Sequence, residues 1–508
     1  MSLASIMSGL RSTRCTTQPV LTVLLLVACC LASGCRGIHK QHSKALQAWR
    51  SGDLNNSARR LQKAAGPLNA EKELLLLDQS IVDLASGEPQ IAESRLRSAR
   101  DRLTYLKQKN ALEQFASTLS DSRAIAWSGR EFEHHMLVNV AMLSSLVNDG
   151  QDAWAWSLQA MQTSQDRRAA LVAEVTKNSG TATLADDTST TAPVDQTVTP
   201  ASFESKPTPK ITAETLDQPL ALSAYLTAIV HSEKPTEKAE TEQALQDVRL
   251  WNPQFSTATA GKLTPLGIQC RKAHGTLHVI VLAGVAPEWV SESCEPTSAA
   301  LLIADQILSA QSKYSLPPTL FSVKIACPQS DNPGHADLTP GAAIVGAGLG
   351  AERRQLGFST IVDLREVAHA SYLAGRDKAI ADAVVRRVVK KGTVVAAKAV
   401  SNESRDWKTD LAMTVIGIAW EALEKADTRS WSTLPAAVRI AAEELPTGEY
   451  SLDLWTRPLS ERYPIHAQPV KVRIEDGRNT CVLLTMPADR ITSAILLGGA
   501  DRNIIPAP

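Results

Sequence analysis

The chain has 508 residues, of which 53 are basic and 53 are acidic, so its formal net charge is zero. A balanced composition generates no overall field that would gather nucleic acid or anionic lipid, which excludes binding to either by bulk charge. The length is enough for roughly two to four domains with cores of their own.

The first 35 residues have the layout of a bacterial lipoprotein signal. Arg11 and Arg14 form a basic segment, residues 20–32 are almost entirely apolar, and small residues precede Cys35. Such an apolar run is too short to span a bilayer comfortably and is typical of a secretory signal. We therefore expect cleavage and acylation at Cys35, with Cys29 as the alternative lipidation site. An ordinary signal peptide with incidental cysteines is the alternative to both.

Export and acylation predict a cell-envelope protein held by lipid, because no second long apolar segment follows. Arg36, rather than an aspartate, follows the acylated cysteine, which favours the outer membrane with the protein facing the periplasm. In that oxidising compartment, four further cysteines predict one or two disulfides of open pairing, with buried free thiols as the alternative. These are Cys270, Cys294, Cys327 and Cys481.

Residues 36–175 contain a repeated spacing. Counting from Gly52 and again from Gly87, a small residue falls at +5, a leucine at +9 and an alanine at +12. This is the turn and second helix of a tetratricopeptide (TPR)-like repeat. A weaker third unit surrounds Gly150. A generic array of helical hairpins is the alternative, and both predict stacked helix pairs with a groove.

Two tryptophans in the third unit are candidates for partner binding. Trp154 and Trp156 cannot both face the core of one helix. One of them is therefore expected to be exposed in the groove as a binding anchor, and burial against the neighbouring repeat is the alternative.

The chain changes character after the repeats. Residues 176–212 are rich in threonine and proline with almost no large apolar side chain, which predicts a disordered linker. Residues 213–258 are expected to form a further helical hairpin, with its turn at Ser232 and Pro235.

The C-terminal half mixes strands and helices. We expect a β-containing region at 259–362, a helical insertion at 363–428, a β-module at 429–495 and a tail at 496–508. The fold class is thus α+β and multidomain, with TPR-like helical repeats followed by a sandwich-like β-rich part with a helical insertion. Strands are expected at 277–282, 321–327, 437–441, 449–455, 470–474 and 480–485, and helices at 363–400 and 406–426.

Turn and motif signals complete the C-terminal half. Asp476 and Gly477 are a strong hairpin signal between two of the predicted strands. Residues 346–351 match a GxGxxA dinucleotide pattern, but too few residues follow for a crossover helix, so a loop is expected.

Two sets of residues contain some of the ligands of a metal site, but neither is a complete set. Cys270, His274 and His278 have the four-residue spacing of ligands on a helix face, but Gly275 interrupts any helix. Glu131 and His134 form at most half a site. We expect no metal, no cofactor and no catalytic residue, and hence no enzyme.

Four islands carry a resemblance to a known group. Residues 129–133, 150–156, 284–287 and 426–435 resemble a widespread group of uncharacterised bacterial envelope lipoproteins with N-terminal TPR-like repeats. The most specific match is Ala-Asp-Thr-Arg-Ser-Trp at 426–431 with the following Leu-Pro. The resemblance runs from about residue 40 to 490 and implies envelope location and this architecture, but no reaction. The chain departs from the group by its Thr/Pro-rich segment, and by Glu288 and Trp289 where a basic residue is usual.

The last island is expected to be a structural junction between the helical insertion and the β-module. Arg429 can pair with Asp427, Trp431 can plug the junction, and Pro435 can stop the preceding helix. Packing of the junction is favoured over binding of a ligand.

These features predict a lipid-anchored envelope scaffold or adaptor that binds another envelope protein through its repeats and does not bind nucleic acid. The alternative is a C-terminal domain that binds a small molecule or glycan, or acts as an enzyme. An ordered polar pocket near residues 284–287 would favour that alternative.

Overall fold

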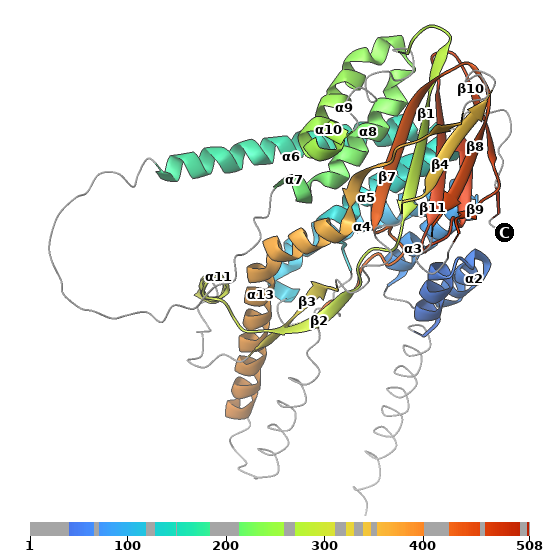
Figure 1. Cartoon of the computed structure of the whole chain (residues 1–508). Helices are drawn as coiled ribbons and strands as arrows, with labels where there is room; N and C mark the ends of the chain where they lie inside the picture. Colours follow the sequence, from blue (N-terminus) through green and yellow to red (C-terminus); the bar gives the residue numbers. More distant parts are fainter. Residues whose placement is uncertain are drawn as a thin grey trace, which may run out of the picture.

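The computed structural model describes most of the chain beyond the signal segment (Figure 1). Cys29 and Cys35, residues 347–352 and the second helix expected at 406–426, except Ala426, lie outside the described residues. Within the described part of the chain, no helix has the length and apolar character needed to cross a membrane. The described residues are 40–65, 71–117, 127–148, 150–182, 213–258, 270–309, 322–329, 339–346, 353–400, 426–457, 463–497 and 505–506.

The N-terminal half is a series of paired helices, as expected for the helical part of the α+β fold. Neighbouring helices pack in antiparallel pairs along the chain. The predicted hairpin at 213–258 is present, and α6 continues through the first seven residues of the expected linker, 176–182. A helix at residues 40–50 is followed by α2 (Leu54–Ala64), α3 (Lys72–Ala85), α4 (Pro89–Ser117), α5 (Glu131–Asn148), α6 (Ala153–Ala182), α7 (Ala213–Leu216), α8 (Gln218–Ser232), η1 (Pro235–Glu237), α9 (Lys238–Trp251) and α10 (Pro253–Ala258).

Glycine makes the turn within each of the first three hairpins. Gly52, Gly87 and Gly150 have φ angles of 78°, 81° and 72°, a conformation that strains any residue with a Cβ. The predicted spacing from the first two glycines is confirmed, because every residue it singled out is buried where two helices approach closely. These are Ser57, Leu61 and Ala64 in α2, and Ala92, Leu96 and Ala99 in α4.

The C-terminal half contains a sandwich of two sheets. The six-stranded sheet has the order β13-β12-β11-β1-β7-β6, and the five-stranded sheet has the path β10-β8-β4-β5 with β9 paired to β8. The strands of the first sheet are β1 (His274–Ala283), β6 (Ser359–Asp363), β7 (Ala437–Pro446), β11 (Asn479–Met486), β12 (Ser493–Leu497) and β13 (Ile505–Pro506). Those of the second are β4 (Gly341–Gly346), β5 (Arg354–Gln355), β8 (Gly448–Thr456), β9 (Ile465–His466) and β10 (Val470–Ile474).

Strand β1 is buried on both faces. Val279 and Val281 pack between the two sheets, whereas Ile280 and Leu282 pack with the helices on the other side. The six-stranded sheet is therefore the middle of three layers, with the five-stranded sheet on one face and α3, α5 and α8 on the other (Figure 1). The helical half and the β-rich half share one core.

The expected regions 259–362 and 429–495 contribute strands to one sheet, because β1 pairs in parallel with β11 and antiparallel with β7. One expectation about the β-rich half is wrong. The turn at Asp476 and Gly477 is present, with a φ of 66° at the glycine, but it does not close a hairpin. It passes the chain from β10 in one sheet to β11 in the other, because the edges of β11 are taken by β1 and β12.

A side module packs against the long helix α13 (Leu364–Val400), which matches the first predicted helix of the insertion. Strands β2 (Trp289–Cys294) and β3 (Val323–Pro328) pair antiparallel. Helix α11 (Ser298–Ser309), which the sequence analysis did not identify, lies between them in the chain. Leu308 and Ile325 share a small core with Ile380 of α13.

Candidate functional site

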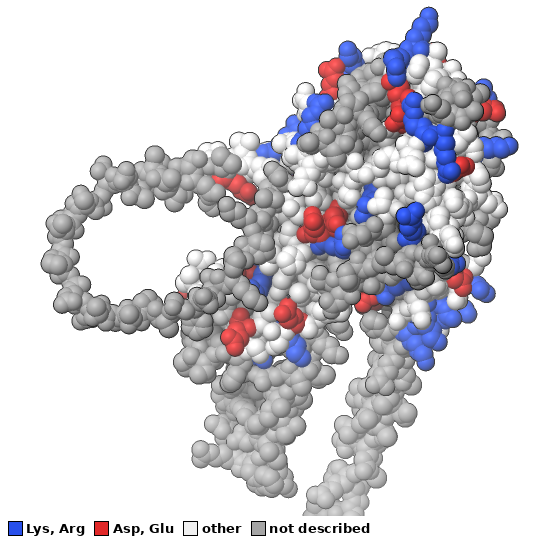
Figure 2. Space-filling model, viewed as in Figure 1, with Lys and Arg blue, Asp and Glu red and all other residues white. Residues whose placement is uncertain are grey.

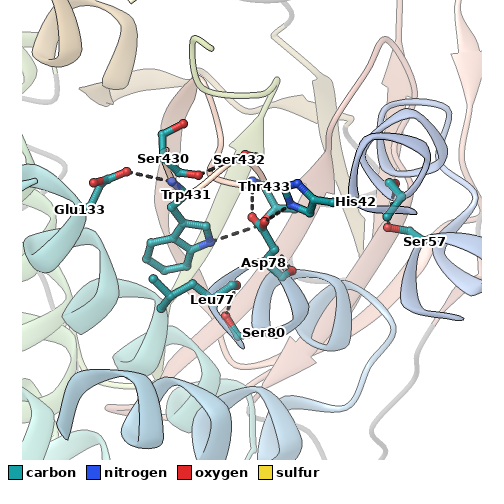
Figure 3. Close-up of polar contacts among 11 residues, drawn as sticks. His42, Ser57, Leu77, Asp78, Ser80, Glu133, Ser430, Trp431, Ser432 and Thr433 are labelled. Atoms are coloured by element: carbon teal, nitrogen blue, oxygen red, sulfur yellow. Dashed lines mark hydrogen bonds and ion pairs between the residues drawn. The ribbon is translucent and has the colours of Figure 1, made fainter. Parts of the chain in front are cut away.

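The first helices of three hairpins together hold a loop from the other end of the chain. We call the side formed by the helix at 40–50, α3 and α5 the inner face, and residues 427–435 the junction loop. Asp78 of α3 is fully buried there. Its Oδ1 accepts a hydrogen bond from the backbone N–H of Thr433 at 2.9 Å, and its Oδ2 lies 2.7 Å from Nε2 of His42 (Figure 3).

A second buried carboxylate, that of Glu133 in α5, binds the same loop. Glu133 Oε1 accepts the backbone N–H of Trp431 at 2.8 Å. Its Oε2 accepts the N–H of Arg130 at 2.6 Å, so the same side chain also caps the first turn of α5. Burial raises the pKa of Glu133, and the neighbouring Arg130 charge offsets only part of that rise. The carboxylate therefore depends on these donors to remain ionised.

Arg130 joins the inner face to two distant segments. Its Nη1 donates to the carbonyl oxygen of Arg429 at 2.8 Å, and its guanidinium carbon lies 3.6 Å from the ring centroid of Trp289. Burial lowers the pKa of Arg130, and the Glu133 charge opposes that effect. The half-buried cation is balanced by Glu133 at 3.7 Å.

The predicted junction residues behave as expected in two respects. Trp431 is 1% exposed in the shared core, and its Nε1 donates to Thr433 Oγ1 at 3.2 Å. Arg429 and Asp427 form an ion pair of 2.7 Å. The role given to Pro435 is wrong, because residues 426–430 are already non-helical and the proline lies just before β7.

The junction loop occupies the inner face as a peptide would occupy a groove. The two carboxylates bind backbone amides of the loop, and the Trp431 ring fills the space beside Leu77 (Figure 3). The carboxylate oxygens of Asp78 and Glu133 are all engaged, so none is left to act on a substrate. Oδ1 of Asp78 and both oxygens of Glu133 accept hydrogen bonds, and Oδ2 of Asp78 contacts the imidazole of His42. Chemically, the arrangement is a buried contact that holds a loop of the same chain.

The roles of Asp78 and Glu133 were not predicted from the sequence. Asp78 was visible as an acid inside the apolar stripe of α3, whose neighbours Leu77 and Ile81 are buried. A buried acid needs a partner, but nothing in the sequence pointed to one 355 residues away.

The two tryptophans of the third unit separate as expected, with one buried and one exposed. Trp156 is 2% exposed, and its Nε1 donates to Glu93 Oε1 at 2.9 Å. The indole of Trp156 is inaccessible to a partner, so the prediction of Trp156 as a partner-binding residue is corrected. Trp154 is 44% exposed on α6, 6.0 Å from Nζ of Lys234, rather than on the inner face.

The four cysteines of the C-terminal half are free thiols, which is one of the two alternatives that the sequence left open. The register of β2 and β3 pairs Cys294 with Val323 and Cys327 with Val290, so those two cysteines do not face each other. Cys481 lies inside β11, and Cys270 contacts Thr276 at 3.0 Å. Burial raises the pKa of Cys481 to about 12 and, together with Glu292, that of Cys327 to about 11, so both stay protonated.

His278 serves packing rather than metal binding. Its Nδ1 lies 2.6 Å from the hydroxyl of Tyr225, and its Nε2 lies 3.2 Å from Oδ1 of Asn479, which ties α8 to the six-stranded sheet. Burial lowers the pKa of His278 to about 4, so the ring is neutral at physiological pH. Among the residues described, no three His, Cys, Asp or Glu side chains are grouped for a metal ion.

A polar cleft of about 560 Å³ lies between α2 and α4 with α3 as its floor. Within it Arg95 pairs with Asp83, whereas Arg59 donates to the carbonyl oxygen of Asn55. The cleft is lined by Asn55, Ala58, Arg59, Gln62, Gln79, Val82, Asp83, Glu88 and Arg95.

His42→Gln should make the junction less dependent on pH. Burial by itself lowers the pKa of His42, but the hydrogen bond and charge of Asp78 raise it above 6.5. Stability from the protonated imidazole is therefore fully present below about pH 6.5 and is lost as pH rises through the folded pKa. The melting temperature of the wild type should exceed that of the variant most at pH 5–6, and the gap should shrink toward pH 8. His466→Gln, at an exposed position, is the control. A difference in melting temperature that stays constant or widens as pH rises would contradict the proposed pairing of protonated His42 with Asp78.

Three of the four islands that carry the resemblance meet at this site. Besides the contact of Arg130 with Arg429, the N–H of Ala286 donates to the carbonyl oxygen of Leu434 at 2.8 Å. Glu288, at a position where the resemblance leads us to expect a base, pairs with Arg50. Comparisons of the chain with protein-family models, with curated proteins and with solved structures found no match.

Proposed function

We propose that this protein is a lipid-anchored, non-catalytic scaffold of the bacterial cell envelope that binds another envelope protein through the outside of its helical hairpins. One observation carries the choice of surface. The inner face is filled by the junction loop, whereas Trp154 and Leu158 are 44% and 42% exposed on α6. A partner in the inner groove would first have to displace the chain's own tryptophan.

The outer surface has the properties of a binding anchor. Trp154 and Leu158 are one helical turn apart and so lie on one face of α6. The buried Trp156, bonded to Glu93, fixes this part of the helix. An exposed tryptophan presented by a rigid helix loses little entropy on binding, and such residues dominate interface energies. The expected partner presents an apolar pocket that receives the indole.

A ligand site in the β-rich half has less support. An ordered pocket with converging polar groups near residues 284–287 would have favoured such a site. Instead, the N–H of Gly284 donates to Met486 at 2.7 Å and that of Ala286 donates to Leu434. Val285 and Ala286 pack against the shared core.

Trp154→Ala should reduce co-purification of the partner at least tenfold after crosslinking in living cells, because removing a central interface tryptophan costs about 2 kcal/mol or more. Partners are identified with the tagged full-length protein. The control is Tyr463→Ala, an aromatic residue 71% exposed on the β-rich half, which should leave capture unchanged. Equal capture by both variants would place the binding surface elsewhere.

Cys35→Ala should release the protein from the membrane fraction, because acylation is the proposed means of attachment. Cys29→Ala is the matched control and should leave the protein attached. Release by Cys29→Ala alone would move the lipidation site, and attachment of the double variant would rule out a lipid anchor at either cysteine.

A further inference from the structure

The charge of the chain is balanced overall but not locally. Residues 40–65 contain six lysines and arginines and a single acid, Asp53, within a chain of zero net charge. Arg50 pairs with Glu288. We call the other five cations the basic end; they are Lys40, Lys44, Arg59, Arg60 and Lys63.

These five cations lie at one end of the first hairpin. Arg60 Nη1 lies 3.4 Å from Oε1 of Gln41, which places the start of the first helix beside the second half of α2. Asp53 sits at the opposite end, where its side chain caps α2 by accepting the N–H of Asn56 at 3.0 Å. Lys and Arg side chains accordingly gather over this hairpin in Figure 2.

The hairpin points its basic end away from the sandwich. At the turn, a Cβ added to Gly52 would lie 3.5 Å from Oγ1 of Thr492, so the turn rests against the β-rich half. The apolar sides of both helices are also used inside the protein, by Trp49 and Leu61 among others. The cations are left on the outward side, and Lys40, Lys44, Arg59 and Lys63 are exposed.

The basic end has no acidic partner among the residues that the structure describes. Arg59 and Arg60 bond only to neutral groups of α2 and Gln41. Elsewhere in the helical half, several arginines pair with acids, as Arg167 does with Asp217 at 2.9 Å and Arg95 does with Asp83. Unpaired cations that repel one another at one end of a hairpin are stabilised by an external anion.

We propose that the basic end lies against the anionic headgroups of a phospholipid bilayer. This inference rests on the proposed lipid anchor for its placement. Cys35 and Lys40 are five residues apart, so the chain between them spans at most about 17 Å. An acyl chain at Cys35 therefore holds the basic end close to the surface whose charge complements it, and the hairpin orients the rest of the protein away from the membrane.

Vesicle binding by an unacylated chain tests the basic end independently of the anchor. The mature chain from residue 35, carrying Cys35→Ser, is mixed with vesicles of phosphatidylcholine, or of equal parts phosphatidylcholine and phosphatidylglycerol. Each cation near an anionic surface strengthens binding about fivefold. Changing Lys40, Lys44, Arg59 and Lys63 to Gln should therefore weaken binding to the anionic vesicles roughly a hundredfold or more.

The matched control neutralises four other exposed cations and should leave binding within about twofold, since those lie away from the basic end. They are Arg249, Lys272, Lys324 and Lys471. Both variants should melt at the wild-type temperature, which excludes misfolding. Salt at about 1 M should abolish the preference for anionic vesicles.

Equal binding to both kinds of vesicle, or equal losses in the two variants, would overturn the proposal. So would a salt-dependent complex with a single-stranded oligonucleotide in the absence of vesicle binding. None of these outcomes bears on acylation, which is tested separately by release of Cys35→Ala in cells.

Discussion

Trp431→Ala should lower the free energy of unfolding by about 3–5 kcal/mol. The side chain is 1% exposed and belongs to the core shared by the helices and the six-stranded sheet. Its removal leaves a cavity between rigid elements, and Thr433 Oγ1 loses its indole donor. Because the junction loop links both halves, the loss should appear as lower stability of the whole fold in chemical denaturation.

Trp154→Ala is the matched control for this effect. It removes the same side chain from a position that is 44% exposed, so it should cost less than about 1 kcal/mol. A loss of unfolding free energy below about 1 kcal/mol for Trp431→Ala would contradict the role of Trp431 as a buried plug of the junction. A separate transition for the helical half and the β-rich half would contradict the shared core.

Glu133→Ala should cost about 3–5 kcal/mol, since removing one partner of a buried pair leaves the other charge uncompensated. The variant leaves the half-buried guanidinium of Arg130 without its carboxylate and removes the acceptor for the N–H of Trp431. Glu133→Gln, which keeps an acceptor but not the charge, should lose less.

Glu131→Ala provides the control on the same helix, because that carboxylate is exposed. Its effect should stay within about 0.5 kcal/mol. The double variant Glu133→Ala with Trp431→Ala should lose less than the sum of the single losses, because both act on one contact. Additive losses would mean that the carboxylate does not hold the loop.

Local patterns in the sequence predicted the elements well. Gly52 and Gly87 marked their turns because only glycine adopts a positive φ without strain, and the small residues after them had to be buried where helices approach. The strand predicted at 470–474 coincides with β10. Such features depend on residues within a few positions of one another, so a single sequence contains them.

Features that depend on distant pairing were not predictable in the same way. Asp476 and Gly477 fixed a turn, but whether it closed a hairpin depended on β1, about 200 residues earlier, which occupies the edge of β11. Likewise, the plug role of Trp431 was predicted from its place in the junction, whereas the acids that bind the junction loop come from two separate hairpins. Glu133 accepts from Trp431, and Asp78 accepts from Thr433. Burial implies that the two acids need partners, but only the fold shows that those partners are backbone amides of the junction loop.

A photo-crosslinking amino acid placed in turn at two positions in living cells tests the central claim most directly. At position 154, on the exposed side of α6, it should form an adduct with a second envelope protein. At position 432, a half-buried site in the junction loop, it should react only within its own chain. Adducts to another protein from position 432, with none from position 154, would show that the partner enters the inner groove and would contradict the proposed binding surface.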